Sequence, residues 1–134
     1  MPKKIIIIPG RPIAKKRPRF ARRGKFVKVY SAQETEEGRT LWEIKEQWAG
    51  VPLDCPIRLF ITALFPVTKT SLKKVEAMLA GGIKHGKKPD LDNIIKFYSD
   101  VCNGTVWRDD SLVYEIEASK GYAKEPQTII HIEW

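Results

Sequence analysis

Apolar residues are concentrated in two short stretches near the start of the chain. Residues 4–8 are a β-branched run ended by Pro9-Gly10, and residues 25–30 alternate between apolar and mostly basic positions. Both patterns are typical of β-strands. The stretch between them, residues 11–24, is basic and has neither helical nor strand periodicity, so we expect a loop there.

A helix is predicted from about residue 32 to residue 49. Ser31 and Glu34 have the spacing of a capping box, in which two side chains bond the free backbone amides at the start of a helix. Apolar residues then recur on one face as far as Trp48, and Gly50 follows as a stop signal.

The second half of the chain alternates between predicted strands and helices. Residues 56–67 form a long apolar run that predicts a central strand. Residues 71–80 and 92–102 have helical periodicity. Residues 111–122 and 128–134 are predicted to be two further strands, which we expect to be antiparallel neighbours because only a short connection joins them.

This order of elements predicts an α/β (α+β) fold with one mixed β-sheet and helices packed on it. The chain has 134 residues, of which 43% are hydrophobic, and no internal repeat or linker divides it. A chain of this size usually forms one domain with its own core, so we expect a single domain over residues 1–134.

Composition argues against several classes of protein. The longest aliphatic run, residues 5–8, is far shorter than the ~20 residues that cross a bilayer, and no secretory signal is recognisable. We therefore expect a cytoplasmic protein with no membrane partner. Two histidines, His85 and His131, are too few and too far apart in the sequence for a typical zinc site, and we expect Cys55 and Cys102 to be free thiols. Any metal site must then use oxygen ligands, as magnesium, manganese and calcium sites do.

The net charge of +8 is concentrated at one end of the chain. Residues 1–30 contain eleven Lys or Arg residues and no Asp or Glu, whereas the rest of the chain carries a slight acidic excess. Such asymmetry indicates a polyanionic partner, and the alternative is a basic tail that only aids solubility. A second group of lysines lies further along the chain. The candidate DNA-binding residues are Arg11, Lys15, Lys16, Arg17, Arg19, Arg22, Arg23, Lys84, Lys87 and Lys88.

Aspartates gather in two segments that one predicted helix separates. Asp90 and Asp92 lie at the start of this helix, and Asp109-Asp110 precede the next strand. Carboxylates are hard oxygen ligands, so we expect folding to bring three of them together around a divalent cation that activates water at a phosphodiester. Lys96, four residues after Asp92, would lie on the same helix face and stabilise charge on the phosphate.

Each of these residues also has a purely structural interpretation. Asp92 is a good N-cap residue, Lys96 can form an ion pair with it, and Asp109-Asp110 suit an ordinary turn. On the residues alone the metal site stays open beside these interpretations, because acids gathered beside a basic segment repel one another unless a cation is bound.

Two parts of the sequence resemble the RusA-type Holliday-junction resolvases. The signature segment is Lys88-Pro89-Asp90-Leu91-Asp92-Asn93, followed by Lys96, Asn103-Gly104 and Asp109-Asp110-Ser111. Residues 10–20 are similar to the N-terminal loop of phage-encoded members. Residues 68–86 form a longer segment than in the most compact relatives.

The resemblance implies a magnesium-dependent endodeoxyribonuclease, with Mn²⁺ as a substitute metal, that acts as a homodimer on branched DNA such as the four-way junction. It also implies a bacterial origin, in a phage or a prophage. It gives catalytic roles to Asp90, Asp92, Asp110 and Lys96, and metal-ligand roles to the three aspartates, with Asp109 as a further candidate. The family's mixed α/β fold agrees with the element order above.

Two other functions remain as alternatives. A non-catalytic basic nucleic-acid-binding module would explain the basic segment, but it gives no reason for Lys96 beside three aspartates. A metal-dependent hydrolase of small phosphoesters would explain the acids, but eleven basic residues in one segment exceed what so small a substrate needs.

Overall fold

The computed structural model describes the backbone of residues 1–16, 19–23, 26–30 and 34–134, and the side chains of residues 1–16 and 34–134. Its elements, in chain order, are strands β1 (Lys3–Pro9), β2 (Arg19–Arg23) and β3 (Phe26–Tyr30), helix α1 (Glu34–Gln47), strand β4 (Ile57–Pro66), helices α2 (Leu72–Leu79) and α3 (Leu91–Cys102), a 3-10 turn η1 (Asp110–Leu112), and strands β5 (Val113–Ala123) and β6 (Gln127–Glu133).

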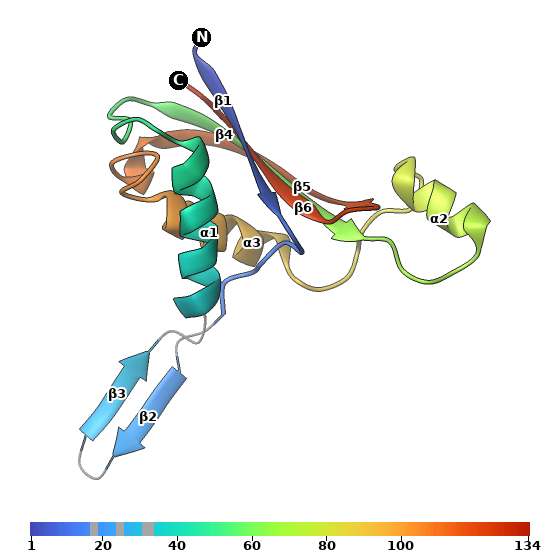
Figure 1. The fold of residues 1–134 in the computed structure, drawn as a ribbon, viewed down its shortest axis with the longest axis horizontal. Helices are drawn as coiled ribbons and strands as arrows, with labels where there is room; N and C mark the ends of the chain where they lie inside the picture. The colour runs from blue at the N-terminus through green and yellow to red at the C-terminus, as the bar shows by residue number, and fades with distance from the viewer. Residues whose placement is uncertain (17–18, 24–25, 31–33) are drawn as a thin grey trace.

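Four strands form a mixed sheet in the order β1-β6-β4-β5, and α1 and α3 pack on one of its faces (Figure 1). Strand β6 is antiparallel to both β1 and β4, whereas β4 is parallel to β5. Parallel neighbours need a long crossover, and α2 and α3 provide it. The predicted α+β fold with one mixed sheet is therefore confirmed.

The prediction that β5 and β6 are neighbours is wrong, because β4 lies between them. Every second residue of β4, from Ile57 to Phe65, is buried against the helices. The most apolar strand takes a central position, where both of its edges find hydrogen-bonding partners. The short connection of residues 124–126 passes the end of β4 instead of making a hairpin turn.

The expected loop over residues 11–24 is also partly wrong. Residues Arg19–Arg23 form β2, which pairs antiparallel with β3 in a separate two-stranded sheet. The pairing uses backbone hydrogen bonds, and the β2 sequence Arg19-Phe20-Ala21-Arg22-Arg23 has no alternation of apolar residues for sequence analysis to detect. The predicted strand at Phe26–Tyr30 is confirmed.

The helices begin close to their predicted positions. The hydroxyl of Ser71 accepts a hydrogen bond from the backbone amide of Lys74 and caps α2. Helix α3 starts at Leu91, so its N-cap residue is Asp90 and not Asp92. Ser31 lies outside the described residues, and the capping box proposed for α1 stays a prediction.

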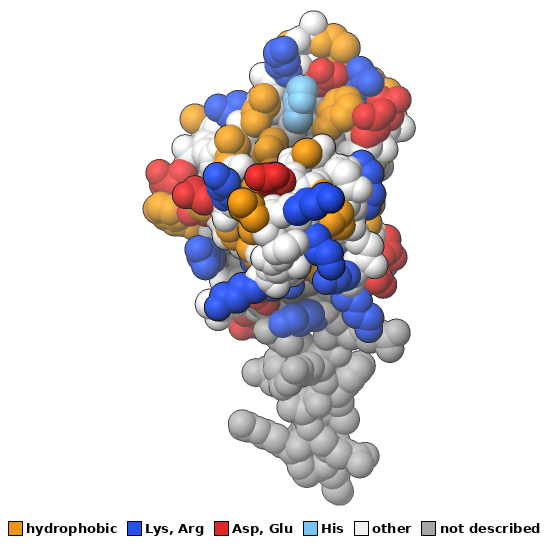
Figure 2. Space-filling view, turned by 90° about the vertical axis from the view of Figure 1, so that its right-hand side faces the viewer, with side chains coloured by type: hydrophobic (Ala, Val, Ile, Leu, Met, Phe, Trp, Pro, Cys, Tyr) orange, Lys and Arg blue, Asp and Glu red, His pale blue; other side chains and the backbone are white. Residues whose placement is uncertain are grey.

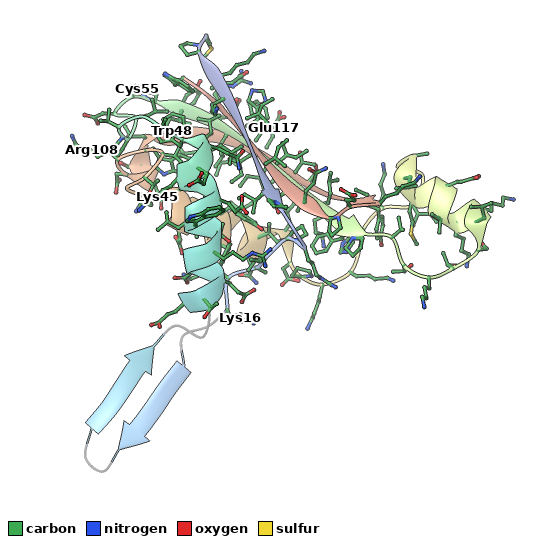
Figure 3. All side chains as sticks on the ribbon, viewed as in Figure 1. Lys16, Lys45, Trp48, Cys55, Arg108 and Glu117 are labelled. Atoms are coloured by element: carbon green, nitrogen blue, oxygen red, sulfur yellow. The ribbon has the colours of Figure 1, made fainter. Side chains whose placement is uncertain are left out.

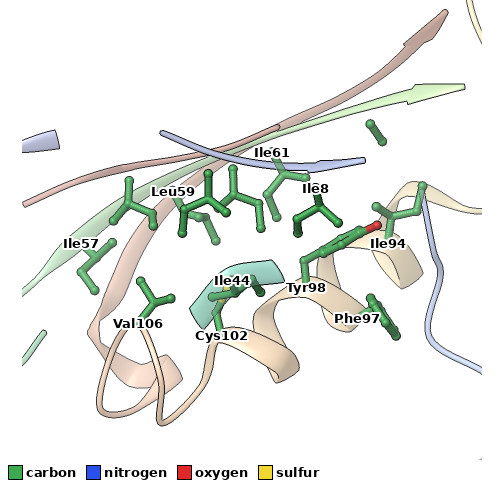
Figure 4. Close-up of a cluster of buried hydrophobic side chains, with 14 of the residues drawn as sticks. Ile8, Ile44, Ile57, Leu59, Ile61, Ile94, Phe97, Tyr98, Cys102 and Val106 are labelled. Atoms are coloured by element: carbon green, nitrogen blue, oxygen red, sulfur yellow. The ribbon is translucent and has the colours of Figure 1, made fainter. Parts of the chain in front are cut away.

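The core lies between the sheet and the two helices (Figure 4). Helix α3 contributes the largest helical share, with Ile94, Phe97, Tyr98 and Cys102 fully buried. Truncating a core aliphatic residue such as Ile61 to Ala should cost about 2–5 kcal/mol of stability. The core therefore holds α3 against one face of the sheet. Both cysteines are free thiols, as expected. In the described part of the chain, no helix is long and apolar enough to cross a bilayer.

Candidate functional site

The first turn of α3 presents two carboxylates to solvent. Asp90 is the N-cap residue, with an extended backbone (φ −68°, ψ 139°), yet its side chain makes no capping hydrogen bond. Asp92 is exposed in the first helical turn. Neither carboxylate has a hydrogen-bond or ion-pair partner among the described side chains. The positive end of the helix dipole stabilises both negative charges.

The structural interpretations of Asp92 and Lys96 are therefore wrong for the described residues. Asp92 is not the N-cap, and no ion pair joins it to Lys96. The ammonium group of Lys96 is exposed one helical turn beyond Asp92, as the sequence predicts. All three charged groups remain available to a ligand.

The first part of the basic N-terminal segment is fixed along α3. The backbone amide of Lys15 donates to the carbonyl of Asn93 at 2.8 Å, and that of Ile13 donates to the Tyr98 hydroxyl at 3.0 Å. Thr128 on β6 also donates to this hydroxyl, at 2.9 Å. Burial raises the pKa of Tyr98, so it stays neutral in this role. Basic residues of the segment are thereby held beside the start of α3.

Between this segment and α3 lies a basic hollow of about 550 Å³. Its lining is Arg11, Lys15, Lys16, Lys88, Pro89, Asp90 and Asn93. Figure 2 shows Lys and Arg side chains predominating in the lower half of the described surface on the side of the molecule where α2 lies. Four cations around a helix N-terminus form an environment that favours a phosphate group.

The cations of the basic hollow differ in how far they are already neutralised. Lys15 pairs with Asp100 at 3.2 Å and with Glu37 at 3.4 Å. Burial lowers the pKa of Lys15, but the hydrogen bond and charge of Asp100, aided by Glu37, raise it overall. Lys16, which Figure 3 places at the foot of α1, pairs with Glu36 at 3.6 Å.

By contrast, Arg11 and Lys88 form no ion pair with a described side chain. The Arg11 guanidinium lies 5.6 Å from the Phe65 ring centroid. These two residues are consequently the most available cations of the hollow.

His85 does not belong to the basic surface, although the sequence places it among lysines. It is 8% exposed and stacks on Phe65 with 4.2 Å between ring centroids, while Tyr122 packs at 5.1 Å. Burial lowers the pKa of His85, and the charges of Lys120 and Lys87 lower it further. The imidazole is therefore neutral at pH 7 and acts as part of an aromatic stack.

Asp109 and Asp110 each have a defined structural contact. Asp109 caps η1, with its carboxylate accepting from the Ser111 amide at 3.0 Å. This hydrogen bond lowers the pKa of Asp109, and Arg108 contributes. The Asp110 carboxylate accepts from the indole Nε1 of buried Trp107 at 2.7 Å. Trp107 is itself a residue of the core.

Asp110 lies at the opposite end of α3 from Asp90 and Asp92. Its charge acts on Cys102, the last residue of the helix, whose pKa is raised chiefly by burial. Ten residues separate Asp92 from Cys102, which corresponds to about 15 Å of helix. Figure 3 accordingly places Arg108 on the side of the molecule away from α2.

The expected cluster of three aspartates does not form within one protomer. Among the described residues, no three His, Cys, Asp or Glu side chains lie close enough together to hold a metal ion. The rigid helix between the two acidic segments keeps them apart. The metal-ligand roles of Asp90, Asp92, Asp110 and Asp109 stay predictions.

The DNA-binding candidates fall into two groups. Lys84, Lys87 and Lys88 are exposed in the loop before α3. Arg17 lies outside the described residues, and the structure gives only the backbone of β2 for the remaining arginines of the segment, Arg19, Arg22 and Arg23. Their contacts with DNA stay predictions.

A family model described as "Endodeoxyribonuclease RusA" matches residues 9–133. The chain belongs to the RusA endodeoxyribonuclease family. In this RusA family member, the matched region includes the lining of the basic hollow and the aspartates at both ends of α3.

Two relatives add detail to this assignment. The uncharacterized protein YqaN of Bacillus subtilis (strain 168) is 28% identical over 137 residues, covering 92% of this chain and 90% of YqaN. The crossover junction endodeoxyribonuclease RusA of Aquifex aeolicus (strain VF5) is 27% identical over 95 residues, covering 70% of this chain and 61% of that protein.

The sequence analysis missed two residues near the site. Asn93 lines the basic hollow and was treated only as part of a motif. Lys120 on β5 donates to the backbone carbonyls of Lys87 and Pro89, at 2.6 and 3.0 Å. No sequence signal marks Lys120, because its importance depends on a loop 31 residues earlier in the chain.

Proposed function

We propose that this RusA family protein is a magnesium-dependent endonuclease that hydrolyses phosphodiester bonds at four-way DNA junctions. The observation that carries the proposal is the pair of unpartnered carboxylates at the start of α3, Asp90 and Asp92, of which Asp90 lines a basic hollow. Family membership supports the same chemistry, and the Aquifex aeolicus relative, a crossover junction endodeoxyribonuclease by name, supports the junction as substrate.

The protein's own groups provide a binding site for one phosphate of the cleaved strand. Arg11 and Lys88 neutralise its charge. The same hollow is lined by Asp90 and Asn93 at the start of α3, where backbone amides have no partner within the helix. Lys96 lies one turn further along the helix, where its ammonium group can stabilise charge that develops during hydrolysis. Asp90 and Asp92 then lie next to the bound phosphate.

The residues at the start of α3 fit a magnesium ion without a third carboxylate nearby. Mg²⁺ is usually held by one or two carboxylates together with water and phosphate oxygens. Asp90 and Asp92 supply the carboxylates, and the DNA supplies the phosphate. When bound, the ion provides charge neutralisation and a water of lowered pKa. Manganese has the same ligand preference and should substitute.

A homodimer gives Asp110 a role that one protomer cannot. If a two-fold axis sets two α3 helices side by side and antiparallel, Asp110 of one protomer approaches the start of α3 in its partner. Each dimer then contains two equivalent composite sites, which suits paired nicks in a symmetric junction. The ~15 Å between the acidic segments within a protomer supports this arrangement.

Strand β5 offers an apolar surface between the two acidic segments. It is an edge strand, and Tyr114 and Ile116 near its start are 60% and 44% exposed. These positions share a sheet face with Lys120, whose contacts reach the loop before Asp90. We assign this surface to a second copy of the chain, because contact there would bring the two halves of the site together.

A labelled immobile four-way junction, incubated with and without Mg²⁺ beside linear duplex of the same sequence, tests the function. We expect Mg²⁺-dependent nicks in the junction only. Asp92→Asn should abolish cleavage and retain junction binding, whereas Glu76→Gln, at an exposed acid of α2, should cut normally. Binding without cleavage by the unaltered protein would leave only the non-catalytic alternative. Turnover of small phosphoesters with no preference for branched DNA would instead favour a metal-dependent hydrolase of small phosphoesters.

A further inference from the structure

The ammonium group of Lys120 donates hydrogen bonds to two backbone carbonyls. Its ammonium nitrogen is 2.6 Å from the carbonyl oxygen of Lys87 and 3.0 Å from that of Pro89, and it donates to both. The side chain comes from β5 and is partly buried. Hydrogen bonds from a charged donor are stronger than those between neutral groups. One lysine therefore fixes the backbone on both sides of Lys88.

The surroundings of Lys120 are basic, so no nearby acid explains its position. Its charge is one of the causes that lower the pKa of His85, together with Lys87 and Arg11. Among the described side chains, no carboxylate forms an ion pair with Lys120. A lysine placed only for solubility would extend into water, away from other cations. The two carbonyl oxygens are the groups that hold it here.

The bonded carbonyls directly precede the proposed catalytic acid. The Pro89 carbonyl belongs to the peptide that leads into Asp90, so bonding its oxygen fixes the orientation of that peptide. The Asp90 side chain makes no capping bond that would fix it independently. The position of its carboxylate consequently depends on the backbone of this loop.

We propose that Lys120 is a positioning residue, which sets the place of the Asp90 carboxylate by bonding the backbone that leads into it. This role rests on the proposed function. Lys120 contacts neither substrate nor metal in this proposal, and it acts only through the loop. A displacement of about 1 Å at a reacting group can lower a rate by up to about a hundredfold.

The test uses Lys120→Met, which keeps the aliphatic stem and removes the donor, with Lys124→Met as the control. Lys124 is exposed just beyond the same strand. In junction cleavage with Mg²⁺, we expect Lys120→Met to lower kcat about tenfold or more. KM, the junction Kd and its salt dependence should match the control. Lys120→Arg should recover part of kcat, because it restores a cationic donor.

A second readout separates this proposal from the proposed function. Amide hydrogen exchange over residues 87–92 should be faster in Lys120→Met than in the control, whether or not the protein cuts DNA. Unchanged exchange together with unchanged kcat would overturn the positioning role. So would a loss of binding with a smaller salt slope, which would make Lys120 a phosphate contact. Lys120→Gln, which keeps a neutral donor, takes the same test if Lys120→Met does not fold.

Discussion

The carboxylate of Asp110 is bonded to the indole Nε1 of Trp107 at 2.7 Å, and the Trp107 ring is fully buried. A carboxylate at the surface is thus held by a hydrogen bond from a core residue. The bond defines the direction of the carboxylate at the end of α3 that lies away from Asp90. Asp110 therefore needs no metal ion to be ordered in one protomer.

Trp107→Phe should separate the orienting bond from the packing of the ring. We expect the free energy of unfolding to fall by about 2 kcal/mol, because the variant loses a hydrogen bond to a charged group and some ring volume. Junction cleavage should also slow, since Asp110 is no longer oriented. Chemical denaturation and cleavage rates measure the two effects.

Trp48→Phe is the matched control for that variant. Trp48 packs edge-on against Trp134 at 5.7 Å, and its indole nitrogen has no partner among the described residues. The control should lose stability through packing alone and keep its cleavage rate. Equal cleavage by the two variants would remove the orienting role of Trp107.

Mixing two inactive variants tests the composite site directly. Asp92→Asn and Asp110→Asn should each be inactive as homodimers, because each defect is present in both sites. In a mixed dimer, one site contains both substitutions and the other contains neither. We expect nicking to return when the two proteins are mixed and allowed to exchange protomers. If all the acids acted within one protomer, every site would contain one defect and the mixture would stay inactive.

The exposed apolar surface of β5 predicts which substitution breaks the dimer. Ile116→Glu should shift the protein towards monomer in sedimentation equilibrium, because it places a charge where an apolar contact is expected. Leu72→Glu, at an exposed apolar residue of α2, should leave the oligomeric state unchanged. A monomeric unaltered protein that still cuts junctions would contradict the shared site.

The basic hollow predicts a measurable dependence on salt. Arg11→Ala and Lys88→Ala should each weaken binding to junction and duplex alike. Each should also reduce the slope of log affinity against log salt by about one, since one phosphate contact is lost. Lys73→Ala, on the exposed face of α2, should change neither quantity. An unchanged slope in all three variants would place the DNA elsewhere.

Local patterns in the sequence predicted most of the elements but not their arrangement. Strand β4 and helix α3 have strong apolar periodicity, and both were found within one or two residues of their predicted bounds. The order of strands in the sheet depends on which edges pair, and no local pattern encodes this. The short connection before β6 therefore suggested a hairpin that does not exist.

The candidate site was predicted in its residues and not in its geometry. Asp90 and Asp110 were found from their motif, but the motif does not show that the whole of α3 lies between them. Their separation is a property of the packed helix. Lys120 gave no signal for the same reason, because its two hydrogen bonds depend on where β5 passes the loop before α3.

The buried imidazole of His85 predicts how stability changes with pH. Burial, with the charges of Lys120 and Lys87, lowers the pKa of His85 from its ordinary value of 6.5. As the pH falls below 6.5, the unfolded chain binds a proton at this position that the folded chain resists. The free energy of unfolding should therefore decrease over the acid side of pH 6.5, and the loss should end once the folded imidazole is also protonated.

His85→Phe isolates this contribution, because it keeps a flat ring between Phe65 and Tyr122 and removes the titrating group. Urea denaturation from pH 5 to pH 8 should show a weaker loss of stability at low pH in this variant. Tyr122→Phe keeps both the stack and the imidazole, so it should retain the full slope. Identical pH profiles for His85→Phe and the unaltered protein would mean that the imidazole is protonated in the folded state as readily as in water. The conclusion that His85 is a neutral member of the aromatic stack would then be wrong.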